Sequence, residues 1–288
     1  GGAIHMTEMI IALDVGGSSV KSGIVDTQGE VSHIRKTPVN SQGDAETILN
    51  TFALVVQSYL TEDRHIKGIG VGFPSPFDYD NGICLIEGVQ KYEAIYGVDI
   101  GDELLSRTDL DVPIRFRNDA EAALVGEAIY GAGKPYDRFI GVTLGTGMGS
   151  SFIAGRERVS AGDGVPEGGF LFPVLFRGEQ ADEWFSTRGL LRRFADDGYV
   201  IDNIGDAATF ARAGNEGLAK VWHAFGRDMG LFLHSHLQAF QAEALLVSGG
   251  IAAAYDLFAD GLIAEVSVPV VCGALGEKGA LLGAVALI

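Results

Sequence analysis

A glycine-rich turn near the start of the chain constrains the fold more than any other stretch. An apolar run over residues 10–13 ends in Asp14, and Gly-Gly-Ser-Ser at residues 16–19 follows before hydrophobic alternation resumes. This pattern predicts two strands joined by a tight turn. We expect the glycines to take positive φ values, which would bring backbone N–H groups close to an anion. An ordinary Gly-Gly hairpin is the alternative interpretation.

The polar side chains of this turn suit the phosphate tail of a nucleotide. Asp14 ends a predicted buried strand, where its carboxylate can hold a hydrated Mg²⁺. Hydroxyl groups and one ammonium add hydrogen-bond donors and a positive charge for an anion. The predicted phosphate-binding residues are Gly16, Gly17, Ser18, Ser19 and Lys21.

The same pattern returns in the second half of the chain. A strand is predicted over residues 139–144, a glycine turn over 145–151 and a second strand over 152–154. A third glycine break, at residues 248–250, follows the predicted strand 244–247 and precedes a helix, where N–H groups can bind phosphate or ribose. The nucleotide-binding candidates of this half are Gly145, Thr146, Gly147, Gly249 and Gly250. An internal repeat of this kind indicates two related domains.

Strands and helices alternate in each half, which predicts an α/β fold of two lobes with a cleft between them. Ligands of such open sheets lie beyond the carboxyl ends of the strands, where all three glycine breaks are expected. A strand over residues 113–117 delivers Asn118 and Asp119 just before a helix over residues 120–130; a helix N-cap is the alternative role for this pair. Residues 78–96 show no clear period. The other expected elements are helices from 44 or 45 to 60, over 99–107, 180–194, 206–212 and 217–240, and from 277 or 278 to 288, and strands over 31–36, 66–73 and 266–271.

Charge and cysteine content exclude several classes of protein. The formal net charge of −17 leaves no basic patch for the phosphates of a nucleic acid. The two cysteines, Cys84 and Cys272, make neither a disulfide framework nor a zinc site, as expected in a reducing compartment. Residues 1–5 are set aside as a remnant of cloning, and neither a signal peptide nor a membrane-spanning run is predicted. We therefore expect a cytoplasmic, soluble protein that binds neither nucleic acid nor membranes.

Four motifs, in this order, resemble the ROK family of sugar kinases and repressors. They are Asp-Val-Gly-Gly-Ser-Ser-Val-Lys at residues 14–21, Asn-Asp-Ala-Glu-Ala-Ala at 118–123, Leu-Gly-Thr-Gly-Met-Gly at 144–149 and Ser-Gly-Gly-Ile at 248–251. The resemblance implies the actin-like ATPase fold of hexokinases, with two RNase H-like lobes over residues 6–118 and 119–288 that close on a sugar and a nucleotide. It also implies a terminal helix that packs back toward the first lobe, and a homodimer.

The resemblance further implies ATP- and Mg²⁺-dependent phosphorylation of glucose or a closely related hexose. Asp119 corresponds to the family's catalytic base, and a carboxylate at a strand end can take the proton of a sugar hydroxyl as it attacks the γ-phosphoryl group. Asn118 would hydrogen-bond the sugar. Glu167 and Glu183 match two sugar-binding acids of the family, although a solvated helix face is the alternative for Glu183. Ser75 replaces a glycine of the family's sugar-binding loop.

The chain departs from the family in its metal-binding segment. Most members bind structural zinc through a histidine and a cysteine cluster, but Phe170 stands at the histidine position and residues 172–180 contain no cysteine. We therefore expect no zinc site, and apolar packing of Phe170, Phe172 and Phe176 in its place.

Loss of that histidine leaves the identity of the sugar open. A kinase for an N-acetylhexosamine or fructose, a polyphosphate-dependent glucokinase and a non-catalytic sugar sensor are the alternatives. ATP is favoured over polyphosphate because the chain lacks the basic surface that a long polyanion requires. An enzyme is favoured over a repressor because the first glycine turn begins close to the start of the sequence, which leaves no room for a helix-turn-helix.

Overall fold

The computed structural model describes residues 6–288, and residues 1–5, set aside above, lie outside the described part. The chain folds into two compact units. The first contains the residues up to Gly126 together with Leu275–Ile288, and the second contains Glu127–Ala274. The units divide inside helix α3 (Asp119–Tyr130), further along the chain than the predicted lobe boundary after residue 118.

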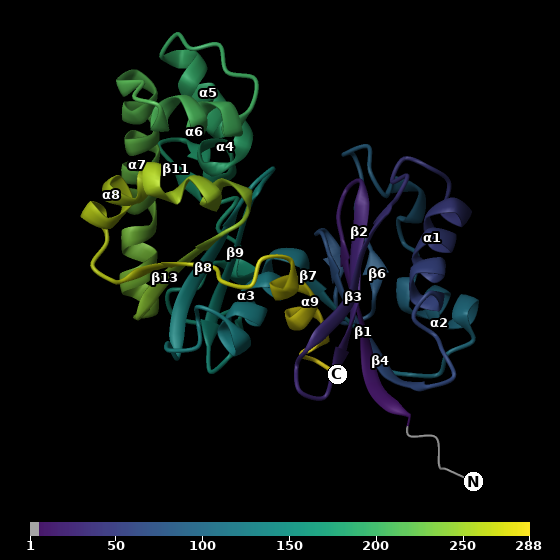
Figure 1. Cartoon of the computed structure of the whole chain (residues 1–288). Helices are drawn as coiled ribbons and strands as arrows, with labels where there is room; N and C mark the ends of the chain where they lie inside the picture. The colour runs from purple at the N-terminus through teal and green to yellow at the C-terminus, as the bar shows by residue number, and fades with distance from the viewer. Residues whose placement is uncertain (1–5) are drawn as a thin grey trace. The chain divides into compact units, whose positions relative to one another are not determined.

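Five strands form the sheet of the first unit, in the order β3-β2-β1-β4-β7 (Figure 1). They are β1 (Thr7–Val15), β2 (Ser19–Asp26), β3 (Val31–Pro38), β4 (Arg64–Phe73) and β7 (Ile114–Asn118). The first three are antiparallel to one another, whereas β4 and β7 run parallel to β1. The carboxyl ends of β1, β4 and β7 therefore meet at one edge of the sheet, called the carboxyl edge below.

Helices cover both faces of this sheet. Ile11 and Leu13 of β1 belong to the apolar cluster that includes helix α1 (Ala45–Gln57). Ala12, between them, packs in a separate cluster with Leu281 of helix α9 (Glu277–Val285). This period of two is what a strand buried on both faces requires. In Figure 1, α1 and α2 (Ile100–Thr108) lie on one side of the sheet and α9 lies on the other.

Three glycines of β4 lie two residues apart and so share one face of the strand. A Cβ atom on Gly70 would lie 2.2 Å from the Ala284 carbonyl oxygen, and one on Gly68 would lie 2.7 Å from Ile288 Cγ2. Because these positions lack side chains, α9 and the chain end that follows it pack directly on the backbone of β4. Gly72 is different, because a Cβ atom there would lie 3.6 Å or more from its neighbours.

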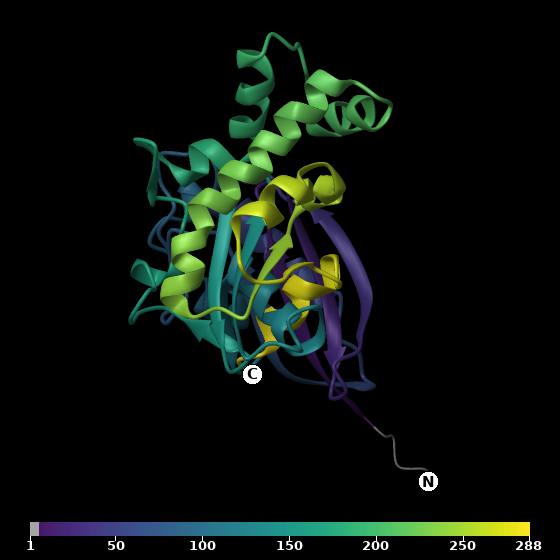
Figure 2. The same ribbon diagram turned by 90° about the vertical axis from the view of Figure 1, so that its left-hand side faces the viewer.

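The second unit repeats the topology of the first. Its sheet has the order β10-β9-β8-β13-β14, with β8, β9 and β10 antiparallel and β13 and β14 parallel to β8. The strands are β8 (Arg138–Leu144), β9 (Met148–Ala154), β10 (Glu157–Val159), β13 (Ala244–Ser248) and β14 (Val270–Cys272). Helix α7 (Glu216–Phe240) crosses this sheet (Figure 2), and its Phe240 ring lies 5.1 Å from that of Phe152. The α/β class and the internal repeat predicted from the sequence are confirmed.

One predicted helix is divided into two. The helix expected over residues 180–194 consists of α4 (Ala181–Phe185) and α5 (Thr187–Asp196). Ser186 separates them because its backbone is extended, and its hydroxyl accepts a hydrogen bond from the Gly189 N–H as the N-cap of α5. An N-cap residue has a non-helical backbone. The spacing of apolar residues continues through Ser186, so periodicity alone did not show that one helix ends there and another begins.

The end of the second unit also differs from the prediction. The last strand begins at Val270 rather than at residue 266, because Pro269 has no N–H for a ladder; α8 (Tyr255–Glu265) ends just before the predicted start. A 3₁₀ turn, η3 (Gly250–Ala254), separates β13 from α8, so the third glycine break does not adjoin α8 directly. The remaining elements are β5 (Phe77–Asp78), β6 (Ile83–Cys84), η1 (Glu93–Ile95), η2 (Glu167–Gly169), β11 (Leu175–Phe176), β12 (Glu179–Gln180) and α6 (Ile204–Arg212). Within residues 6–288, none of the helices has both the length and the apolar character needed to cross a membrane.

Candidate active site

Two carboxylates lie on either side of a glycine at the carboxyl edge of the first sheet. In the register of the parallel strands, Asp14 pairs with Gly72, and Gly72 pairs with Arg117 two residues before Asp119. A Cβ atom on Gly72 would lie 3.7 Å from an Asp14 carboxylate oxygen and 3.7 Å from the Asp119 Cα atom. The strand order therefore brings together two predicted residues that are far apart in the sequence.

The surroundings of these two carboxylates disfavour negative charge. Burial raises the pKa of Asp14 to about 6, the charge of Asp119 adds to this rise, and Lys21 opposes it. Burial also raises the pKa of Asp119, whereas a hydrogen bond from the Ala120 N–H (2.9 Å) and the charge of Lys91 lower it. Perturbed carboxyl groups that neighbour each other are typical of catalytic and cation-binding sites.

Asn118 is the last residue of β7, and both polar atoms of its side chain form hydrogen bonds. Its carbonyl oxygen accepts a hydrogen bond from the Glu121 N–H (3.2 Å), which caps helix α3. Its amide nitrogen donates to the hydroxyls of Ser75 and Tyr79, each at 3.4 Å. The structure thus brings the predicted sugar contacts Asn118 and Ser75 together. It adds Tyr79, which sequence analysis missed because it lies in the stretch without a period.

The first glycine turn is fastened through its carbonyl groups. The Gly16 carbonyl accepts from the Tyr92 hydroxyl, and the Gly17 carbonyl accepts from Ser41 Oγ at 2.6 Å. The predicted positive φ is wrong, since neither glycine of the turn has one. Close packing explains why residue 16 is a glycine. The Gly16 N–H donates a hydrogen bond to the Ser19 carbonyl, and a Cβ atom on Gly16 would lie 3.2 Å from that oxygen.

The polar residues after this turn remain accessible. Ser18 is exposed and Ser19 is half-buried. Lys21 pairs with Asp14 in the β1–β2 register, so it lies at the strand end that carries the first carboxylate. Its ammonium also lies 3.6 Å from a Glu277 carboxylate oxygen, which offsets part of its charge.

In the second unit, Asp182 fastens the turn between β8 and β9. Its carboxylate accepts from the Met148 N–H (2.7 Å) and from the Arg188 guanidinium (2.6 Å). The Gly145 carbonyl accepts from both the N–H and the hydroxyl of Thr187, at 2.8 and 3.0 Å. The start of α5 therefore holds the turn in place. The sequence showed Asp182 only as a neighbour of Glu183, with nothing to indicate this contact.

The third glycine break lies beside the second turn. Gly249 has a φ of 90°, and a Cβ atom on it would lie 2.5 Å from the backbone nitrogen of Leu144, the last residue of β8. A Cβ atom on Gly250 would meet no atom within 4 Å. Thr146 and Gly147 of the second turn are exposed. The nucleotide-binding candidates of the second unit are therefore neighbours, and among them only Gly249 has a positive φ.

The two acids predicted to bind sugar have different surroundings. Both carboxylate oxygens of Glu183 accept from Arg188, at 3.2 and 2.7 Å, and this interaction lowers the pKa of Glu183. Glu167 begins η2, and its side chain is exposed. The loop that carries it is attached to β9, because Ser150 Oγ donates to the Gly169 carbonyl at 2.8 Å. Glu183 is thus held in one orientation, whereas Glu167 is positioned only by its backbone.

Aromatic packing occupies part of the segment in which the sequence predicted apolar side chains in place of a zinc site. Phe170 and Phe172 pack against each other at a centroid distance of 5.8 Å, and Phe172 is 38% exposed. Three rings surround Phe176 at centroid distances between 5.5 and 5.7 Å, those of Trp184, Phe185 and Phe232. The expected apolar packing is therefore found at Phe176, while Phe172 lies at the surface. Among residues 6–288, no group of three or more His, Cys, Asp or Glu side chains could hold a metal ion.

Comparison with known proteins identifies the family. A sequence model of the ROK family matches residues 10–288. The glucokinase of Thermotoga maritima is 24% identical over 316 residues, which cover 97% of this chain and 96% of that protein. The beta-glucoside kinase of Listeria monocytogenes is 30% identical over 190 residues, which cover 64% of this chain and 61% of that protein. The structure of a ROK family glucokinase from Streptomyces griseus in complex with glucose and AMPPNP is 24% identical, with a TM-score of 0.75 over 97% of this chain and 98% of that one. The chain belongs to the ROK family and has its actin-like ATPase fold, as the sequence motifs predicted.

Proposed function

We propose that this sugar kinase transfers the γ-phosphoryl group of ATP to a hydroxyl of glucose or a closely related hexose. The observation that carries the proposal is the pair of carboxylates on either side of Gly72 at the carboxyl edge of the first sheet. Relatives named glucokinase and beta-glucoside kinase support the class of substrate. In the reaction the sugar oxygen forms a bond to the γ-phosphorus, and the bond from that phosphorus to the bridging oxygen breaks, so that ADP leaves.

Asp119 is the proposed general base. Its carboxylate is half-buried at the start of α3, and one of its oxygens accepts from the Ala120 N–H, so the side chain is oriented before a sugar binds. Burial raises its pKa, which makes the carboxylate a stronger proton acceptor than an exposed aspartate. Asp119 would therefore take the proton of the attacking hydroxyl.

The predicted sugar contacts offer both hydrogen-bond donors and acceptors to hydroxyl groups. In the first unit, the amide of Asn118 and the hydroxyl of Ser75 lie within hydrogen-bond distance of each other beside the proposed base. In the second unit, Glu183 is oriented by Arg188, and Glu167 presents an exposed carboxylate. Neutral donors together with charged acceptors are what recognition of several hydroxyl groups requires.

Asp14 is the residue that fits Mg²⁺. Burial and the charge of Asp119 both destabilise the ionised form of Asp14. A divalent cation bound beside it would stabilise that ionised form. Proteins usually hold Mg²⁺ through one or two carboxylates together with waters and substrate phosphates, so a cluster of three acids is not needed. When bound, the ion would neutralise charge on the phosphates. The three glycine breaks, with Ser18, Ser19 and Lys21, would hold those phosphates through backbone and side-chain donors.

A turnover assay with a panel of sugars tests the proposal. ADP release would be followed with glucose, mannose, N-acetylglucosamine, N-acetylmannosamine, fructose and a β-glucoside, with ATP or with polyphosphate as donor. We expect one aldohexose to be phosphorylated from ATP with a kcat of about 1–100 s⁻¹. If no sugar is turned over with either donor while one still raises the melting temperature, the protein is a sugar sensor and the proposal fails.

Truncation of Asp182 tests the second glycine turn as a nucleotide site. In Asp182→Ala the Met148 N–H loses its acceptor, so the turn is no longer held in one conformation. We expect the Kd of AMPPNP, measured by calorimetry, to rise about tenfold. Glu179→Ala is the control, because Glu179 also pairs with an arginine, Arg192 at 2.8 Å, but does not contact the turn. Equal affinities of the two variants would show that this turn does not bind the nucleotide.

A further inference from the structure

Lys91 lies between β6 and η1, in the stretch that showed no sequence period. Its side chain is half-buried, and its Cδ atom lies 3.7 Å from the position that a Cβ atom on Gly17 would take. Its positive charge acts on the carboxylate of Asp119. The side chain therefore lies against the first glycine turn, which follows the carboxyl end of β1.

The backbone on both sides of Lys91 has an unusual conformation. Gln90 and Tyr92 each have a φ of 58°, in the left-handed region that residues with a Cβ atom rarely adopt. Two such residues around one lysine persist only where contacts with the surroundings enforce them.

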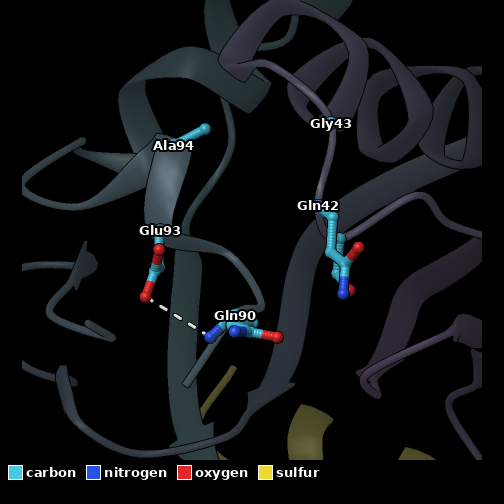
Figure 3. Close-up of a pocket in the computed structure, with 6 residues that line it drawn as sticks. Gln42, Gly43, Gln90, Glu93 and Ala94 are labelled. Carbon is cyan, nitrogen blue, oxygen red and sulfur yellow. Dashed lines mark hydrogen bonds between the residues drawn. The ribbon is translucent and has the colours of Figure 1, made fainter. Parts of the chain in front are cut away.

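Tyr92 and Gln90 make those contacts. Tyr92 is fully buried; its hydroxyl donates to the Gly16 carbonyl, and its N–H donates to the Ser41 carbonyl at 2.7 Å. The Gln90 N–H donates to a Glu93 carboxylate oxygen at 3.3 Å, the hydrogen bond drawn in Figure 3. A pocket of about 380 Å³ separates Gln90 and Glu93 from residues 41–43 (Figure 3). Lys91 is thus held against the glycine turn by the same tyrosine that fastens the turn.

The ammonium of Lys91 is available to an anionic ligand. Within residues 6–288, no carboxylate oxygen lies within 4.0 Å of its nitrogen. Lys21, the other lysine at this edge, is partly neutralised by Glu277 at 3.6 Å. Burying part of a lysine side chain without pairing its ammonium is unfavourable for folding, which indicates a role in binding.

We propose that Lys91 binds the γ-phosphoryl group as it passes from ATP to the sugar. This inference rests on the proposed function. In phosphoryl transfer, charge spreads over the three non-bridging oxygens, and a cation fixed beside them stabilises the transition state. Lys91 keeps its proton and donates hydrogen bonds to these oxygens, while the proton of the sugar hydroxyl goes to Asp119.

The test compares Lys91→Met, which keeps the aliphatic stem, with Lys91→Arg, which keeps the charge. We expect Lys91→Met to lower kcat about a hundredfold while the KM of the sugar changes less than about threefold. The Kd of ADP should stay within about twofold, whereas the Kd of AMPPNP should rise about tenfold, because only AMPPNP carries the γ-phosphoryl group. Lys91→Arg should recover at least about a tenth of the wild-type kcat. Lys220→Met, at an exposed position of α7, is the matched control and should behave like the wild type.

Three results would overturn the inference. A kcat of Lys91→Met within about threefold of the wild type would show that the phosphoryl group does not need this cation. A raised sugar KM with unchanged kcat would place Lys91 on the sugar instead. A lowered melting temperature of Lys91→Met, with equal losses of ADP and AMPPNP affinity and no recovery in Lys91→Arg, would make its role structural. Absence of turnover in the wild type is a separate result against the proposed function, and the comparison of ADP with AMPPNP would still test Lys91.

Discussion

Asp119→Asn is expected to lower kcat by about a thousandfold, the loss typical of a missing general base. The amide cannot accept the proton of the sugar hydroxyl, but it has nearly the same shape as the carboxylate. Sugar binding should therefore persist, with a KM within about threefold of the wild type, because binding does not require proton transfer. Initial rates across a range of sugar and ATP concentrations measure both values.

The same substitution is expected to preserve the fold or to stabilise it. The asparagine side-chain oxygen can still accept from the Ala120 N–H, and loss of the charge removes the repulsion with Asp14. Because burial raises the pKa of Asp119, its charged form destabilises the folded state above that pKa, and a neutral side chain removes this effect. The melting temperature of the ligand-free protein near pH 7 should therefore be equal to or higher than that of the wild type.

Asp99→Asn is the matched control for Asp119→Asn. Asp99 also lies at the start of a helix in the first unit, where it accepts from the Asp102 N–H at 2.9 Å. It undergoes the same chemical change and should retain wild-type turnover. A kcat of Asp119→Asn above about a tenth of the wild type would rule Asp119 out as the base. A clear fall in its melting temperature would instead attribute the loss of activity to the fold.

The sequence predicted the parts of this molecule that depend on short stretches of chain. A glycine turn after an apolar run indicated each β-hairpin, and recurrence of the turn indicated the two sheets of equal topology, which the structure confirms. The position of Asp119 after a strand and before a helix predicted its place at the carboxyl edge. These features depend on neighbours in sequence, so local patterns were sufficient to identify them.

Features that depend on distant residues were missed or were given the wrong physical reason. Positive φ was expected at Gly16, where close approach of a carbonyl is the actual constraint. Tyr79 and Lys91 lie in a stretch without a period, and only the fold brings them to Asn118 and Asp119. Periodicity reports which face of a regular element is buried, and it carries no information about which side chain an irregular segment places at a site.

The spacing of the β4 glycines shows why a prediction of stability needs the structure. Gly70→Ala is expected to lower the free energy of unfolding of the first unit by about 3 kcal/mol. Its Cβ atom would lie 2.2 Å from the Ala284 carbonyl oxygen and 2.8 Å from the Val285 Cα atom, so α9 would have to move away from the sheet. The contacts are to backbone atoms, which no change of rotamer can relieve. Denaturant unfolding followed by circular dichroism measures the loss.

Gly72→Ala is the matched control, because it places the same methyl group on the same face of the same strand two residues later. Its Cβ atom would lie no closer than 3.6 Å to any neighbour, so we expect a change in the free energy of unfolding within about 0.5 kcal/mol. Both substitutions reduce the entropy of the unfolded chain equally, so that contribution cancels between them. The difference between the two variants therefore isolates the packing of α9 on β4, and equal stabilities would mean that α9 does not lie on the bare backbone of this strand.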